Sequence, residues 1–174
     1  MPQPALLDRI ELEIKDLLAA NQLKRAAAVL AELRPADVAD LLGRLDRDEK
    51  LQVFSLLADE VAGEVLEKTD PETRRLLIEN VEPRRLSHLL ELIPADDAAS
   101  VLEDVPRPEA QGLISLMEPA EAEDVEELLH YREGTAGRLM TDSFVSIPQN
   151  VTAQEAIDLL RGLGPDVESF YHLY

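Results

Sequence analysis

Carboxylates are the residues of this sequence that are most able to do chemistry. The 174 residues include 36 Asp and Glu against 17 Lys and Arg, for a net charge of −19. Residues 91–130 hold twelve acids and one base, Arg107, so more than half of the net charge lies in less than a quarter of the chain. Dense like charge destabilises the compact state, and bound divalent cations relieve it. The acidic segment therefore indicates either an ordinary solvated helix surface or a surface that binds cations.

Other kinds of chemistry find no support in the residue pattern. His88, His130 and His172 lie far apart and none has a second histidine at a metal-binding spacing, so surface or packing roles are expected. The chain has no cysteine, which excludes disulfides, zinc thiolate sites and thiol nucleophiles. The glycines at 134 and 137 lack the lysine and the preceding strand of a phosphate-binding loop. No nucleophile and base are marked by their context, so an enzyme is not expected.

Charge and composition also limit the partners. Nucleic-acid binding requires a basic face, which a chain of this net charge does not offer. Aromatic residues make up only 3% of the sequence, too few for a base-stacking platform. The first eighteen residues carry acids within their apolar stretch and do not resemble a signal peptide. No stretch approaches the ~18 apolar residues of a membrane span, so a soluble segment that binds no nucleic acid is predicted.

The elements that must position the acids follow a twelve-residue repeat. Apolar residues recur at this spacing or twice it: Leu33, Leu45, Leu57, Val81, Ile93, Val105, Met117 and Leu129. Prolines follow many of them by one or two residues, where proline favours a helix start. In one unit Ala98, Val101, Leu102 and Val105 form an apolar stripe at helical spacing. Helices of about nine residues are too short to be stable alone and must stack. Residues 1–130 are therefore predicted to form an all-α, right-handed superhelix of short helices.

The pattern changes from Tyr131 onward. Residues 131–143 bear glycine, break the period and are expected to be a linker. Phe144–Ile147 is predicted to be a strand, and Thr152 with Glu155 forms a capping box for a helix over 153–161. A second strand is expected to begin at Phe170. Residues 144–174 would then be a β-α-β unit whose last strand lacks partners, which favours a fragment of a longer protein.

At this junction the sequence resembles a known family. Gly134-Thr135-Ala136-Gly137-Arg138-Leu139-Met140-Thr141 is similar to the linker of MgtE-type magnesium transporters. The segments Phe144–Ile147, Thr152–Ala156 and Ser169–Tyr174 follow in that family's order. The preceding repeat is similar to the family's cytosolic N-terminal domain, and the end of the chain resembles the start of its first CBS domain.

The resemblance implies a function. Members are homodimeric Mg²⁺ channels with a membrane pore and a pair of CBS domains, and this segment would lie at the cytoplasmic face of the membrane. Mg²⁺ bound between the N-terminal and CBS domains would favour pore closure, and low Mg²⁺ would release them. The excess of acids fits this scheme. The alternative is a helical-repeat scaffold that binds a protein partner, similar to the middle domain of flagellar motor switch proteins.

The resemblance also implies Mg²⁺ ligands on two helices. The candidates are Glu64, Asp96 and Asp97, with Glu60 and Glu67 as weaker ones. Glu64 matches a family glutamate, and Asp96 matches an acid at a helix start, with Asp97 beside it. Glu60, Glu64 and Glu67 share one helical face by their spacing. Ser100 stands where the family can show a further aspartate, and this departs from the family pattern.

Overall fold

The computed structural model describes residues 4–131, 135–137, 140 and 147–162. Within these residues it contains eleven helices and no strand. The helices are α1 (Pro4–Ala19), α2 (Leu23–Ala31), α3 (Pro35–Arg44), α4 (Arg47–Ser55), α5 (Asp59–Lys68), α6 (Pro71–Asn80), α7 (Pro83–Glu91), α8 (Ala95–Glu103), α9 (Arg107–Ile114), α10 (Pro119–His130) and α11 (Ala153–Gly162). The all-helical prediction for the repeat region is confirmed.

The helices reproduce the twelve-residue period of the sequence. From α2 to α10, each helix begins twelve residues after the one before it. Proline is the first residue of α3, α6, α7 and α10, where its missing amide hydrogen leaves no helical bond unmade. Pro94 and Pro106 instead lie one residue earlier, at the N-caps of α8 and α9. Proline thus sets the start of six of these nine helices.

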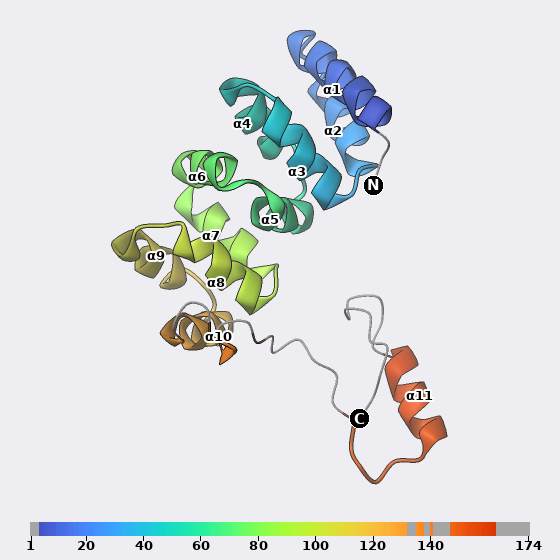
Figure 1. Ribbon diagram of the computed structural model, residues 1–174, viewed down its shortest axis with the longest axis vertical. Coiled ribbons are helices and arrows are strands. Elements are labelled where there is room, and N and C mark those ends of the chain that lie inside the picture. The colour runs from blue at the N-terminus through green and yellow to red at the C-terminus, as the bar shows by residue number, and fades with distance from the viewer. Residues whose placement is uncertain (1–3, 132–134, 138–139, 141–146, 163–174) are drawn as a thin grey trace.

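The helices are arranged as a stack (Figure 1), and buried apolar side chains form its core. Most of the close packing joins a helix to the one two places further along, as in α3 with α5, α5 with α7, and α8 with α10. The predicted stripe of α8 is buried: Ala98, Val101, Leu102 and Val105 are all at most 6% exposed. Each short helix therefore buries its apolar face against neighbours from the same chain. The right-handed sense of the superhelix stays a prediction.

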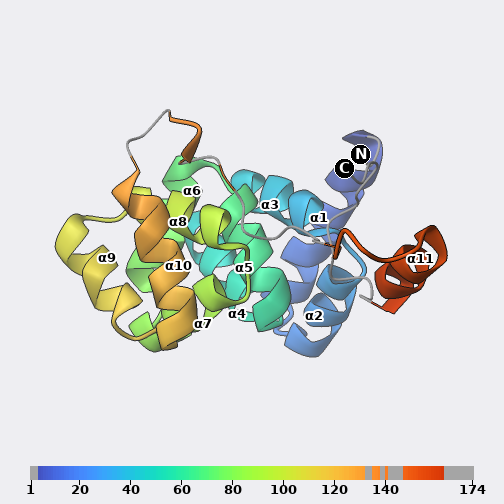
Figure 2. The same ribbon diagram turned by 90° about the horizontal axis from the view of Figure 1, so that it is seen from below.

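The last described helix differs from the stack. α11 matches the predicted helix, and its capping box is present: Thr152 N donates to Glu155 Oε2 at 2.7 Å, and Glu155 N donates to Thr152 Oγ1 at 3.3 Å. None of its residues is buried, and it stands clear of the stacked helices in both views (Figures 1 and 2).

The two predicted strands largely fall outside the described residues. Residues 144–146 and 170–174 are not described, and Ile147, which is, lies in no strand. The β-α-β unit stays a prediction, and its helix, α11, is the part that the structure describes. Among the described residues, no helix combines the length and apolar character needed to cross a membrane.

Candidate acidic site

Helix α5 carries three of the candidate acids on its outer side. It packs against α3, α6, α7 and α8, and its residues Ala62, Gly63, Val65 and Leu66 are buried. At Gly63 the backbone of α5 lies close to α7, since a Cβ there would lie 2.8 Å from Leu89 O. With these residues turned inward, Glu60 and Glu64 are exposed and Glu67 is half-buried. The shared face predicted from their spacing is therefore consistent with the burial pattern of α5.

Helix α8 places the other two candidates beside α5. Asp96 and Asp97 lie in the first turn of α8, where the helix dipole favours negative charge, and both are half-buried. The N-cap residue Pro94 offers no side-chain hydrogen bond to this turn. The Oδ1 atom of Asp96 is buried and has no hydrogen-bond partner among the described residues. A buried acceptor left unpaired costs about 1–3 kcal/mol, so this oxygen favours any donor or cation that reaches it.

Acids from the two helices meet around Lys68, the last residue of α5. Lys68 Nζ lies 2.8 Å from Glu67 Oε2. The hydrogen bond to Glu67 raises the pKa of Lys68 above its ordinary value, partial burial opposes this rise, and the negative charges of Glu67, Asp97 and Glu64 add to it. The structure therefore brings three candidates, Glu64, Glu67 and Asp97, into one electrostatic neighbourhood. Asp96 lies next to Asp97 in the first turn of α8, and Glu60 lies one turn before Glu64 on α5.

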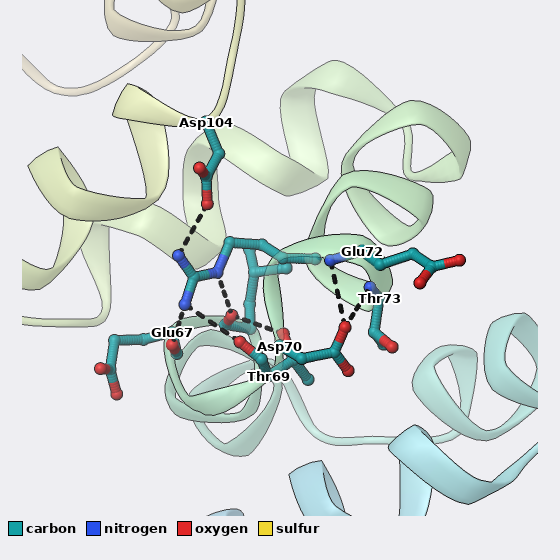
Figure 3. Close-up of polar contacts among 8 residues, drawn as sticks. Glu67, Thr69, Asp70, Glu72, Thr73 and Asp104 are labelled. Atoms are coloured by element: carbon teal, nitrogen blue, oxygen red, sulfur yellow. Dashed lines mark hydrogen bonds and ion pairs between the residues drawn. The ribbon is translucent and has the colours of Figure 1, made fainter.

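An arginine of α6, Arg74, fixes the end of α5 through contacts that include Glu67, Thr69 and Asp104 (Figure 3). The guanidinium of Arg74 donates to the carbonyl oxygens of Leu66, Glu67 and Thr69, with the Leu66 and Thr69 bonds at 3.1 Å. It also donates to Asp104 Oδ2, at the end of α8, at 2.8 Å. These carbonyls belong to the last turn of α5 and to its C-cap residue Thr69, where a helix leaves carbonyl oxygens without internal donors. Arg74 thus joins α5, α6 and α8 in one polar junction.

The described residues do not form a ready-made metal centre. They contain no group of three or more His, Asp or Glu arranged to hold a metal ion. Mg²⁺ prefers oxygen ligands and keeps several waters, so one or two carboxylates from each of two surfaces suffice. The acids of α5 and α8 fit this donor type. His88 and His130 are exposed, as expected, and bond locally to Glu91 and Glu126, while His172 lies outside the described residues.

The fold and the site define a helical-repeat domain whose surface gathers carboxylates from two packed helices. Residues 33–134 match the family model described as the MgtE intracellular N domain. The chain therefore belongs to the MgtE family, and the resemblance seen in its sequence is confirmed.

Individual relatives agree with this assignment. The chain is 30% identical over 170 residues to the magnesium transporter MgtE of Thermus thermophilus, covering 96% of this chain and 38% of that protein. It is 29% identical over 174 residues to the magnesium transporter MgtE of Bacillus subtilis, covering 100% of this chain and 39% of that protein. The chain thus spans less than two fifths of the length of these relatives.

Two solved structures share the fold. A crystal structure of the cytosolic domain of the Mg²⁺ channel MgtE in complex with ATP superposes with a TM-score of 0.82 at 30% identity, covering 92% of this chain and 66% of that one. A crystal structure of the soluble part of a magnesium transporter gives a TM-score of 0.84 at 22% identity, covering 95% and 65%, and supports the fold alone.

Proposed function

We propose that this chain is a cytosolic, Mg²⁺-sensing regulatory segment of a magnesium channel or transporter. The observation that carries the proposal is the meeting of acids from α5 and α8 around one ammonium, in a chain of the MgtE family. Carboxylates gathered on one surface repel one another unless cations screen them. Occupation of the surface by Mg²⁺ supplies that screening, and its loss restores the repulsion.

The rest of the assembly follows from the same proposal. Residues 1–130 form the regulatory domain, 131–143 the linker, and 144–174 the beginning of a CBS domain. Within a homodimer at the cytoplasmic face of the membrane, the acids of α5 and α8 would face carboxylates of the CBS domains. Mg²⁺ shared between these surfaces favours a closed pore, and low Mg²⁺ lets the regulatory domain move away. Glu64, Asp96 and Asp97 are the main proposed ligands, and Glu60 and Glu67 support them.

Limited proteolysis of the full-length protein tests the proposal. Millimolar Mg²⁺ is expected to protect residues 131–143 from cleavage, because it holds the domains on either side together. Ca²⁺ and monovalent salt at equal ionic strength are the comparison, since screening alone does not distinguish the ions. A protein whose cleavage follows ionic strength and not Mg²⁺ would favour the protein-interaction scaffold instead.

Substitutions then assign the ligands. Glu64→Ala and Asp96→Ala are each expected to raise the Mg²⁺ concentration at half protection by roughly threefold or more, because each removes a full negative charge from the site. Glu13→Ala is the matched control: Glu13 is also an exposed acid on a helix, but α1 does not pack closely against α5 or α8. If all three variants keep the wild-type midpoint, Glu64 and Asp96 are not ligands.

A further inference from the structure

We propose that Lys68 is a built-in counter-ion of the acidic site, which competes with divalent cations and sets the Mg²⁺ concentration at which the site fills. The inference rests on the proposed function, since it concerns regulation of the same site. It adds a residue that the sequence pattern did not single out. At low Mg²⁺ the ammonium of Lys68 would offset the repulsion between the carboxylates. When a divalent ion binds, the ion would displace the ammonium from them.

The position of the Lys68 side chain carries the first step. Residues adjacent in a helix do not face each other, so an ion pair between neighbours requires one side chain to bend toward the other. Lys68 Nζ nevertheless lies 2.8 Å from Glu67 Oε2. The side chain of Lys68 is 39% exposed and that of Glu67 is 28% exposed, so the protein covers part of each. Lys68 is therefore directed toward the acidic side of α5.

The surroundings of Lys68 carry the second step. Glu64 lies four residues earlier on α5, the spacing and order in which Glu and Lys attract each other best on a helix. Asp97 stands on α8, which packs against α5, and its negative charge adds to the rise in the pKa of Lys68. Lys68 also stands at the C-terminus of α5, where the helix dipole favours a cation. Arg74, the nearby base of the Figure 3 junction, is bonded to carbonyl oxygens and Asp104. Lys68 is thus a base paired directly with a candidate ligand, Glu67.

Because Lys68 lies beside these acids, its ammonium competes with Mg²⁺ for the same carboxylates. Glu64, Glu67 and Asp97 supply three negative charges, and Lys68 offsets one of them while its ammonium hydrogen-bonds a carboxylate oxygen of Glu67. In water, a divalent ion about 6 Å from a fixed ammonium is repelled by enough to weaken binding roughly tenfold at low salt and roughly threefold after screening by physiological salt. Removing the ammonium also frees the Glu67 oxygen. Loss of Lys68 should therefore tighten Mg²⁺ binding, an effect that ordinary structural damage does not produce.

The experiment is the same Mg²⁺ titration of linker cleavage in the full-length protein, with three variants. Lys68→Gln is expected to lower the Mg²⁺ midpoint about three- to tenfold, and this shift should shrink as monovalent salt is added. Lys68→Arg keeps the charge and is expected to stay near the wild-type midpoint. Lys15→Gln is the matched control, because Lys15 is similarly exposed at 36% and pairs with Glu11 at 2.9 Å on α1, away from α5.

The outcomes separate the two proposals. If Mg²⁺ does not change linker cleavage in the wild-type protein, both the Mg²⁺-sensing function and the counter-ion role of Lys68 are overturned. A wild type that responds, together with a Lys68→Gln midpoint that is unchanged or higher, overturns the counter-ion alone. A midpoint lowered equally by Lys15→Gln also overturns it, because the effect would then reflect net charge and not the place of Lys68.

Discussion

Helices α8 and α11 are both short and amphipathic, yet they are stabilised in different ways. α8 has nine residues and buries Ala98, Ala99, Val101 and Leu102 against α5, α7 and α10. α11 has ten residues and a complete capping box, yet none of them is buried, and Ile157 and Leu159 are 43% and 49% exposed. An apolar face stabilises a short helix only where a neighbour covers it. In the stack the repeat itself supplies those neighbours.

The largest effect is expected when one apolar side chain is truncated in the stack and another in α11. Phe54 of α4 is 1% exposed, so Phe54→Ala should lower the free energy of unfolding of the stack by about 3–5 kcal/mol. Ile157→Ala in α11 should change it by less than about 0.5 kcal/mol. Urea denaturation of the 174-residue chain, followed by circular dichroism, measures both. Similar losses for the two variants would show that α11 shares the cooperative core of the stack.

The sequence predicted the stack because its signal is repeated and local. Apolar residues and prolines recur at one spacing, and each proline acts on the backbone next to it, so the helix starts could be placed without knowledge of the fold. The capping box of α11 was predictable for the same reason, since Thr152 and Glu155 lie within one turn. The handedness of the superhelix depends on how neighbouring helices cross, which no single repeat determines.

The polar groups around the candidate site were less predictable. The sequence, through the family resemblance, indicated the acids of α5 and α8. It did not indicate that the charge of Asp97 acts on Lys68, because that depends on α8 packing against a helix three repeats earlier. Arg74 was missed because three of its partners are main-chain carbonyl oxygens, which every residue possesses and no pattern of side chains marks. Long-range capping of this kind is visible only once the helices are in place.

A substitution at Arg74 tests whether polar contacts, in addition to apolar burial, stabilise the stack. Arg74→Met removes the donors of the Leu66, Glu67 and Thr69 carbonyls and of Asp104, and should lower the free energy of unfolding by about 1.5–3 kcal/mol. Arg75→Met is the matched control on the same helix, because Arg75 is exposed, and should cost less than about 0.5 kcal/mol. Equal unfolding midpoints in urea for the two variants would leave apolar burial as the main source of stability.

The smallest expected effect compares one type of helix cap in the two regions. Asp70 Oδ1, at the N-cap of α6, accepts hydrogen bonds from Thr73 N at 2.9 Å and Glu72 N at 3.1 Å. Asp70→Ala should therefore lower the free energy of unfolding by about 0.5–2 kcal/mol at neutral pH. Thr152→Ala, which removes the corresponding cap of α11, should leave the unfolding of the stack unchanged because α11 buries none of its residues.

The pH dependence of the Asp70 effect has a defined sign. The bonds from Thr73, above all the one from its backbone amide, hold the pKa of Asp70 below its ordinary value of 3.8. A carboxyl with a lowered folded-state pKa stabilises the fold fully above that ordinary value, and the contribution is lost as the pH falls through the folded-state pKa. The stability difference between wild type and Asp70→Ala should thus be constant from neutral pH to about pH 5 and narrow below 3.8. Urea denaturation at several pH values measures it, and a difference that widens on acidification would mean that Asp70 acts through something other than its charged cap.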